Sequence, residues 1–206
     1  MNPAPNPPMS QPLEPAPDSV SRTRLTVCVF CGARAGSQPR FLELARRTGT
    51  AIARSGATLV YGGGSVGMMG ALADAALQAG GEVIGVIPSA LVAREVGHAA
   101  LTRNEVVADM QVRKQRMIEL SDAFLTLPGG LGTLDELFEV LTLRQLREHD
   151  KPILVVDDEG YFAPLIACLR SIVAHGLVAQ ADIDVMERFD SPEAALARLG
   201  LHAPPT

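Results

Sequence analysis

The sequence lacks any long apolar segment. None of its apolar runs approaches the roughly 20 residues that a helix needs to cross a bilayer, so we expect no membrane partner. Residues 1–20 contain neither the basic stretch nor the apolar stretch that a secretory signal combines. From these absences we expect the protein to act in the cytoplasm.

Cysteine is also scarce. The chain has three cysteines, an odd number that does not favour a disulfide framework. Cys28 and Cys31 form a C-x-x-C pair, which could be redox-active or half of a zinc site. They lie inside the apolar run LTVCVFC, however, and Cys168 has no close thiol or histidine companion in the sequence. We therefore predict that Cys28 and Cys31 are buried strand residues, and we expect no metal and no cofactor.

An excess of positive charge is missing as well. The 206 residues include 18 Lys and Arg against 23 Asp and Glu, a net charge of −5. Such a chain has no electrostatic reason to bind nucleic acid, so we expect no nucleic-acid partner. Apolar residues are plentiful, at 47% of the chain, which is enough for one sizeable core.

Proline divides the chain into two parts. Residues 1–22 hold seven of the fifteen prolines and few large apolar side chains, a composition typical of a disordered tail. Residues 23–206 are expected to form the folded domain.

Within this domain, short apolar runs alternate with helical patterns. Buried strands are expected at residues 25–30, 57–61, 82–87, 122–127 and 152–157. Helical patterns cover residues 39–55, 66–80, 108–121, 133–149, 161–176 and 191–200. Strict alternation predicts an α/β fold, namely a Rossmann-like parallel sheet with helices on both faces in a single domain. In such sheets ligands bind at the carboxyl ends of the strands.

Two glycine-containing loops follow the first two expected strands. The first, CGARAGS, is weak evidence by itself. The second, YGGGSVGMMG, contains G-x-G-x-x-G at Gly62, Gly64 and Gly67, in the strand–turn–helix setting of a dinucleotide site. The acidic residue that should end the next strand is missing, which argues against an NAD-dependent oxidoreductase. A phosphate or sugar could still approach the backbone at Gly63, Gly64 and Gly67.

The segment LPGGLGTLDELFEV, residues 127–140, places a glycine-rich loop directly before a helical pattern. A helix N-terminus with uncovered N–H groups suits a phosphate, and three residues leave them uncovered here, Gly129, Gly130 and Gly132. Thr133 is a good N-cap and forms with Glu136 an S/T-x-x-E capping box. Asp135 and Glu136 in a first turn also suit the helix dipole. Spacing alone leaves two interpretations of Glu136 equally open, a catalytic carboxylate or a cap.

An arginine falls on the apolar face of the helical pattern at 108–121. Met110, Arg113 and Met117 recur at i, i+3 and i+7. An arginine is rarely placed on such a face without an anion to meet. The alternative is a long side chain that reaches past the apolar residues to the surface.

These residues carry a resemblance to a known family. Residues 128–136, PGGLGTLDE, match the P-G-G-x-G-T-x-x-E signature of the Lonely Guy family of cytokinin riboside 5′-monophosphate phosphoribohydrolases, often mislabelled lysine decarboxylases. Arg113 and Lys114 stand where the R-K pair of the family precedes this signature. YGGGSVGMMG, GVIP and KPILVVDDEGYF resemble further family blocks, so the similarity covers residues 25–177.

The resemblance implies hydrolysis of the N-glycosidic bond of a cytokinin riboside 5′-monophosphate or of AMP, which releases the free base and ribose 5-phosphate. It makes Arg113 and Glu136 the catalytic pair. The residues it implies for substrate binding are Glu95, Lys114, Gly129, Gly130, Leu131, Gly132, Thr133, Leu134, Asp135 and Thr142. Family relatives are dimers or hexamers, and the helix from Leu134 carries more apolar residues than one core-facing stripe needs. We therefore expect a homodimer.

The chain departs from the common family pattern at several positions. Leu131 stands in place of Tyr, Asp135 of Glu, Leu143 of Trp, Gln111 of His and Ala33 of Ser. These changes are expected around the base and ribose, so they bear on the preferred base more than on the reaction. The alternative function is a non-catalytic module that senses or carries a phosphorylated nucleotide in the same pocket.

Overall fold

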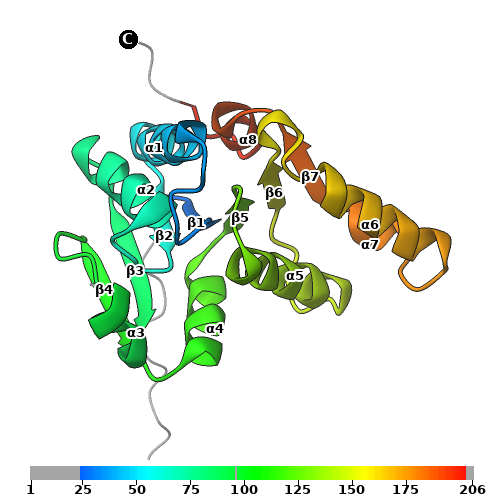
Figure 1. Cartoon of the computed structure of the whole chain (residues 1–206), viewed down its shortest axis with the longest axis horizontal. Helices are drawn as coiled ribbons and strands as arrows, with labels where there is room; N and C mark the ends of the chain where they lie inside the picture. Colours follow the sequence, from blue (N-terminus) through cyan, green and yellow to red (C-terminus); the bar gives the residue numbers. More distant parts are fainter. Residues whose placement is uncertain (1–23, 96, 203–206) are drawn as a thin grey trace, which may run out of the picture.

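The computed structural model describes residues 24–95 and 97–202 (Figure 1). The expected tail at residues 1–22 lies outside the described residues. All strand pairs in the sheet are parallel, which confirms the predicted fold class. The strands are β1 (Thr26–Phe30), β2 (Thr58–Tyr61), β3 (Val83–Pro88), β4 (Arg103–Val107), β5 (Ala123–Thr126), β6 (Ile153–Val156) and β7 (Met186–Phe189).

The sheet has the strand order β4-β3-β2-β1-β5-β6-β7. The five central strands are the five that the sequence predicts, whereas β4 and β7 at the two edges are not predicted. Edge strands are less buried, and the sequences RNEVV and MERF accordingly include charged residues. A pattern of fully buried apolar runs therefore does not predict β4 or β7.

The helices are α1 (Pro39–Arg54), α2 (Gly67–Gln78), α3 (Ser89–Glu95), α4 (Met110–Leu120), α5 (Leu131–Gln145), α6 (Ala163–Ala174), α7 (Gln180–Asp184) and α8 (Pro192–Arg198). A 3₁₀ turn, η1 (Asp158–Gly160), precedes α6. The short helices α3 and α7 are not predicted by the sequence pattern. In the described part of the chain, no helix is both long enough and apolar enough to cross a membrane.

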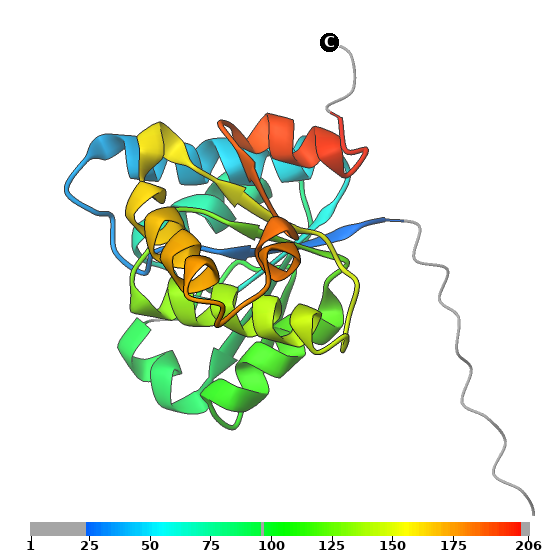
Figure 2. The same ribbon diagram turned by 90° about the vertical axis from the view of Figure 1, so that its right-hand side faces the viewer.

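Helices cover both faces of the sheet (Figure 2). The core on one face includes residues of α1, α2 and α8. The core on the other face includes residues of α4, α5 and α6. Central strands buried on both faces can be apolar throughout, which explains why periodicity of two is absent from the predicted strands.

Strand β1 shows how neighbouring residues serve the two cores. Val27 and Val29 belong to the core under α1 and α2, while Cys28 and Phe30 belong to the core under α4 and α5. Cys31, just after the strand, belongs to the first of these cores. Both cysteines of the C-x-x-C pair are buried, as predicted.

The strand order reverses direction beside β1. Strands β2, β3 and β4 extend from one side of β1, and β5, β6 and β7 extend from the other. The connections that follow β1 and β5 leave the sheet in opposite directions, which opens a crevice at the carboxyl ends of these two strands. Ligands bind in such crevices in sheets of this kind. The loops after β1 and after β5 therefore meet at the expected ligand site.

The contact between α1 and α2 provides a test of the packing. A Cβ atom at the buried Gly49 would overlap the Leu72 carbonyl oxygen and lie 3.1 Å from the Ala76 nitrogen. Helix propensity alone favours Gly49→Ala by about 1 kcal/mol. We expect the clash to prevail, with a loss of about 2 kcal/mol in the free energy of unfolding measured in urea. Thr50→Ala is the control on the same helix, and a net stabilisation by Gly49→Ala would show that the helices are less closely packed.

Candidate active site

A cavity of about 630 Å³ lies at the carboxyl ends of β1 and β5. Its walls come from the loops after β1, β2, β5 and β6, together with side chains of α1, α2, α3, α4 and α5. The charged side chains that line it are Arg34, Arg113 and Glu136. Apolar side chains from four helices and a tyrosine complete much of the wall, namely Phe41, Met68, Met69, Leu91, Met110 and Tyr161.

The start of α5 differs from the prediction. Gly130 is the N-cap residue and the helix begins at Leu131, so Thr133 is the third helical residue. Glu136 is the sixth, and the first turn contains no acidic residue. The predicted capping box and the predicted acidic first turn are therefore wrong. The N-cap is a loop glycine, so the helix starts three residues upstream of the position that Thr133 indicates.

The three glycines of the loop before α5 have different reasons to be glycine. A Cβ atom at Gly129 would overlap the Thr133 hydroxyl, so packing requires this glycine. Cβ atoms at Gly130 and Gly132 would meet no protein atom within 4 Å, and neither residue has a positive φ. Both glycines line the cavity. Neither packing nor backbone conformation therefore explains why these two residues are glycine. Access of a ligand to the backbone would explain it.

Arg113 and Glu136 line the cavity and form a buried ion pair. The Arg113 Nη1 atom donates to Glu136 Oε1 at 3.0 Å. The relative exposure of the two residues is 7% for Arg113 and 8% for Glu136. The inward orientation of Arg113 that the helical spacing predicts is thus confirmed, and the alternative of a side chain extending to the surface is excluded.

Two backbone carbonyls hold the same guanidinium from the sheet. Arg113 Nε donates to the Val86 oxygen of β3 at 3.1 Å, and Nη2 donates to the Gly62 oxygen at 3.2 Å. A Cβ atom at Gly62 would overlap Nη2, so the absence of a side chain there makes room for the arginine. The first glycine of the G-x-G-x-x-G motif therefore serves a side chain from α4, 51 residues away.

Burial dominates the electrostatics of the carboxylate. Loss of solvent raises the pKa of Glu136 from its ordinary value to about 7, although the nearby Arg113 charge opposes this shift. A carboxyl group with a pKa close to neutrality can exchange a proton at physiological pH, as general bases and acids do.

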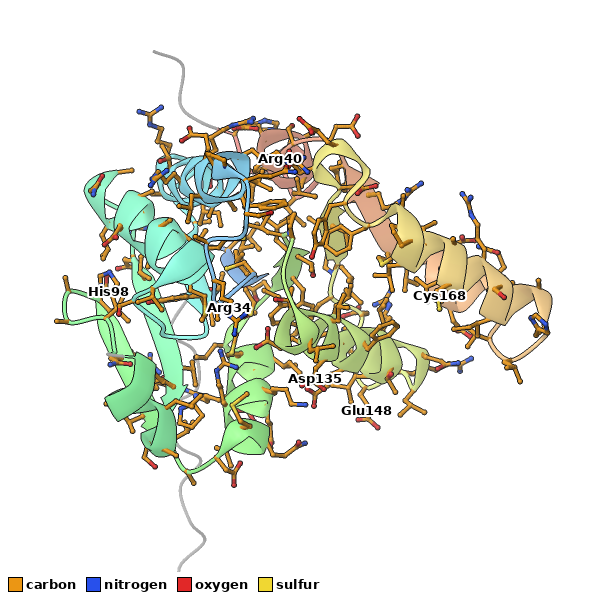
Figure 3. All side chains as sticks on the ribbon, in the orientation of Figure 1. Arg34, Arg40, His98, Asp135, Glu148 and Cys168 are labelled. Carbon is orange, nitrogen blue, oxygen red and sulfur yellow. The ribbon has the colours of Figure 1, made fainter. Side chains whose placement is uncertain are left out.

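Three of the residues predicted to bind substrate make contacts within or between α4 and α5 instead. Lys114 Nζ contacts Asp135 Oδ2 at 3.1 Å and Glu139 Oε2 at 2.9 Å, which joins α4 to α5. Hydrogen bonds to these carboxylates, that to Glu139 above all, raise the pKa of Lys114. Asp135 is largely exposed (Figure 3). Thr142 is exposed and its hydroxyl donates to the Phe138 carbonyl within α5.

Among the described residues that were predicted to bind substrate, only the loop and its first helical turn line the cavity, namely Gly129, Gly130, Leu131, Gly132 and Thr133. Lys114, Leu134, Asp135 and Thr142 are not part of its lining. Glu95 is the last residue of α3, and its side chain lies outside the described part of the structure.

Backbone conformation and close packing account for Gly63 and Gly67 in the loop after β2. Gly63 and Gly67 have φ values of 76° and 62°, which side chains of L-residues rarely tolerate. A Cβ atom at Gly67 would overlap the Ala33 carbonyl in the loop after β1. Gly64 is buried. Of this loop, Gly62 is the residue that lines the cavity.

Several cavity residues were not predicted individually. Arg34 lies in the CGARAGS loop, which the sequence marks only as a weak candidate, and it extends from that loop beside the cavity (Figure 3). Tyr161 comes from the segment after β6, and its hydroxyl donates to the Gly129 carbonyl at 2.7 Å. Nothing in the local sequence of either residue indicates these contacts, because the partners come from distant segments.

Within residues 24–95 and 97–202, no three His, Cys, Asp or Glu side chains are grouped closely enough to hold a metal ion. The cavity presents instead one ion pair, one further arginine and a helix N-terminus. Together with the sheet topology, these features define a Rossmann-like α/β protein with a candidate ligand site at the reversal of strand order.

Comparison with known proteins gives the family. The model of a family described as "Possible lysine decarboxylase" matches residues 69–199. A cytokinin riboside 5′-monophosphate phosphoribohydrolase of Rhodococcoides fascians is 44% identical over 182 residues, 88% of each chain. One from Arabidopsis thaliana is 39% identical over 178 residues, 86% of this chain and 84% of the relative. The chain therefore belongs to this family, the Lonely Guy family recognised from its signature.

Solved structures share the fold at low identity. The molybdenum cofactor carrier protein of Chlamydomonas reinhardtii matches with a TM-score of 0.64 at 20% identity, covering 86% of this chain and 96% of that one. The molybdenum cofactor binding protein of Rippkaea orientalis matches with a TM-score of 0.66 at 24% identity, covering 87% and 98%. Similarity at this level establishes a common architecture.

The Tyr161 hydroxyl should hold the loop before α5 in place. Tyr161→Phe removes its hydrogen bond to Gly129 and keeps the edge contacts of the ring with Phe41 and Phe162. We expect the free energy of unfolding to fall by about 1 kcal/mol. Hydrogen–deuterium exchange across residues 127–134 should become several-fold faster. Unchanged exchange there would show that the loop is held by its other contacts.

Proposed function

We propose that this protein hydrolyses the N-glycosidic bond of cytokinin riboside 5′-monophosphates, of AMP, or of both, and releases the free base and ribose 5-phosphate. The observation that carries the proposal is the buried Arg113–Glu136 pair, which faces the same cavity as the open N-terminus of α5. The similarity to phosphoribohydrolases over most of both chains supports the reaction class.

The N-terminus of α5 is the proposed phosphate site. The amides of Leu131, Gly132 and Thr133 belong to the first helical turn, where N–H groups have no acceptor within the helix. Gly130 and Gly132 leave the space beside them open. Backbone donors and the positive end of the helix dipole together favour a phosphate at this position.

Glu136 is the proposed catalytic carboxylate. Breaking the bond between C1′ and the base nitrogen gives the ribose oxocarbenium character, which a nearby negative charge stabilises. Arg113 donates to Oε1, and no described residue donates to Oε2. Oε2 is therefore available to accept a proton from the water that attacks C1′. The base leaves with the bonding electrons and takes up a proton, so the products are the free base and ribose 5-phosphate.

Arg113 has an orienting and electrostatic role in this scheme. A guanidinium has a pKa above about 12, so it does not serve as the proton donor. Three of its N–H groups are used by Glu136, Val86 and Gly62. A guanidinium has five, so two remain for the ligand. Its charge also counteracts the burial that disfavours the ionised form of Glu136.

The experiment is to incubate the purified protein with AMP and with isopentenyladenosine monophosphate, and to separate the products by chromatography. The proposal predicts free base and ribose 5-phosphate in equal amounts. Tight binding of either nucleotide without release of base would contradict hydrolysis and favour the non-catalytic nucleotide-binding module.

Glu136→Gln separates catalysis from structure. The amide oxygen can still accept from Arg113, so we expect the free energy of unfolding to stay within about 1 kcal/mol of the original. Turnover should fall by about a hundredfold or more, because the group that accepts the proton and stabilises positive charge is lost. Glu139→Gln is the control, a carboxylate three residues later that pairs with Lys114. Near-normal base release by a folded Glu136→Gln protein would refute the catalytic assignment.

The raised pKa of Glu136 sets the expected pH dependence. The carboxylate is the active form in this mechanism, and its pKa is about 7. Because this pKa is that of the ligand-free protein, kcat/KM should rise with pH and level off above about pH 7, and it should fall about tenfold for each unit below. The residual activity of Glu136→Gln should lack this dependence. A rate that falls as pH rises through 7 would mean that the protonated acid is the active form.

We further propose that α4 and α5 form the interface of a homodimer. Large apolar side chains are exposed along both helices, including Met110 and Val112 on α4, Phe138 on α5 and Leu146 directly after α5. The helices lie side by side, joined by the ion pairs of Arg113 and Lys114. Large apolar side chains exposed on neighbouring helices are consistent with a protein–protein contact.

Light scattering tests the dimer. We expect a dimer mass at micromolar concentration, and a monomer mass for Phe138→Glu, because a charge would be buried unpaired in the interface. Leu177→Glu is the control, since Leu177 is 77% exposed and lies after α6, outside both helices. A monomer mass for the original protein would contradict the proposal.

A further inference from the structure

One cation on the cavity wall has no counter-ion. Arg113 and Glu136 neutralise each other at 3.0 Å, which leaves Arg34 as the remaining charged group of the lining. Among the described residues, no carboxylate lies within ion-pair distance of Arg34, and its side chain is exposed. Arg40, at the start of α1, differs in this respect because it pairs with Asp158 at 2.7 Å.

The backbone of Arg34 is held firmly although its side chain is exposed. Two residues earlier, the Gly32 amide donates to the Pro128 carbonyl at 3.2 Å, which joins the loop after β1 to the glycine loop before α5. The backbone of Ala33 and Arg34 also packs closely on Gly67 at the start of α2. A Cβ atom on Gly67 would lie 2.7 Å from the Arg34 carbonyl carbon. The guanidinium therefore extends from a fixed point beside the proposed phosphate site.

We propose that Arg34 binds the 5′-phosphate of the substrate from the side opposite the α5 N-terminus, and so determines the preference for nucleotides over unphosphorylated nucleosides. This inference rests on the proposed function. A phosphate monoester carries a charge of about −1.5 to −2 at pH 7. The helix N-terminus contributes roughly half a positive charge, so one arginine brings the site close to neutrality. A guanidinium also matches two phosphate oxygens at once.

Arg34 is a binding residue in this proposal and takes no part in bond cleavage. Arg34→Gln should therefore raise KM for the nucleoside 5′-monophosphate about tenfold and leave kcat nearly unchanged. Arg34→Lys keeps the charge and loses the paired geometry, so its KM should be intermediate. Because the group is exposed, KM of the original protein should rise with salt more steeply than KM of Arg34→Gln.

Binding of ribose 5-phosphate, measured by titration calorimetry, provides a readout that does not depend on catalysis. Its Kd should increase about tenfold in Arg34→Gln, and weak binding of ribose should be unaffected. Arg54→Gln is the matched control, since it removes an exposed arginine from the opposite end of α1. Melting temperatures should stay within about one degree, because Arg34 has no described side-chain partner to lose.

The outcomes separate this inference from the function on which it rests. If the original protein releases base, and Arg34→Gln binds ribose 5-phosphate as tightly as the original protein does, the role of Arg34 is refuted and hydrolysis stands. If the original protein releases no base but binds ribose 5-phosphate through Arg34, the phosphate role stands and hydrolysis is refuted. Failure of the original protein to bind ribose 5-phosphate at all would overturn the assignment of Arg34.

Discussion

The buried ion pair between Arg113 and Glu136 is the constraint on which the rest of the site depends. Removing two charges from water is costly unless each finds a partner of good geometry. Here the guanidinium is shared by a carboxylate and by the carbonyls of Val86 and Gly62, so three separate segments must be in register for the pair to exist. Formation of the pair therefore fixes α4 and α5 relative to the sheet.

The cavity arises from the way the chain crosses the sheet. Because strand order reverses beside β1, the loops after β1 and β5 meet, and the Gly32 amide joins them at the Pro128 carbonyl. The loop before α5 thus supplies a helix N-terminus, the loop after β1 an exposed arginine, and the ion pair lines the same cavity. An acidic protein with a net charge of −5 can in this way concentrate positive charge locally, as the proposed phosphate site requires.

Sequence reasoning succeeded where a residue's role depends on local periodicity and failed where it depends on distant partners. The five central strands and the inward position of Arg113 follow from apolar spacing, and the structure confirms both. The capping box was wrong because glycines can themselves begin a helix, so a well-placed Thr133 did not mark its N-terminus. The edge strands β4 and β7 lack the apolar runs of buried strands. The contacts of Tyr161 and the surroundings of Arg34 come from segments that only the fold brings together.

The central position of β1 has a consequence for how the chain reaches its folded state. β1 pairs with β2 soon after it in sequence, but its other neighbour is β5, and the Thr26 amide bonds to the Asp122 carboxylate 96 residues away. During synthesis, the edge of β1 that pairs with β5 stays unpaired for on the order of ten seconds, because β5 is synthesised that much later. Contacts this distant in sequence slow folding, and an unpaired apolar strand is prone to aggregate. The strand order that brings the loops after β1 and β5 together therefore also leaves one edge of β1 unpaired in the nascent chain. Until β5 has been synthesised, that edge must be kept from pairing with other chains.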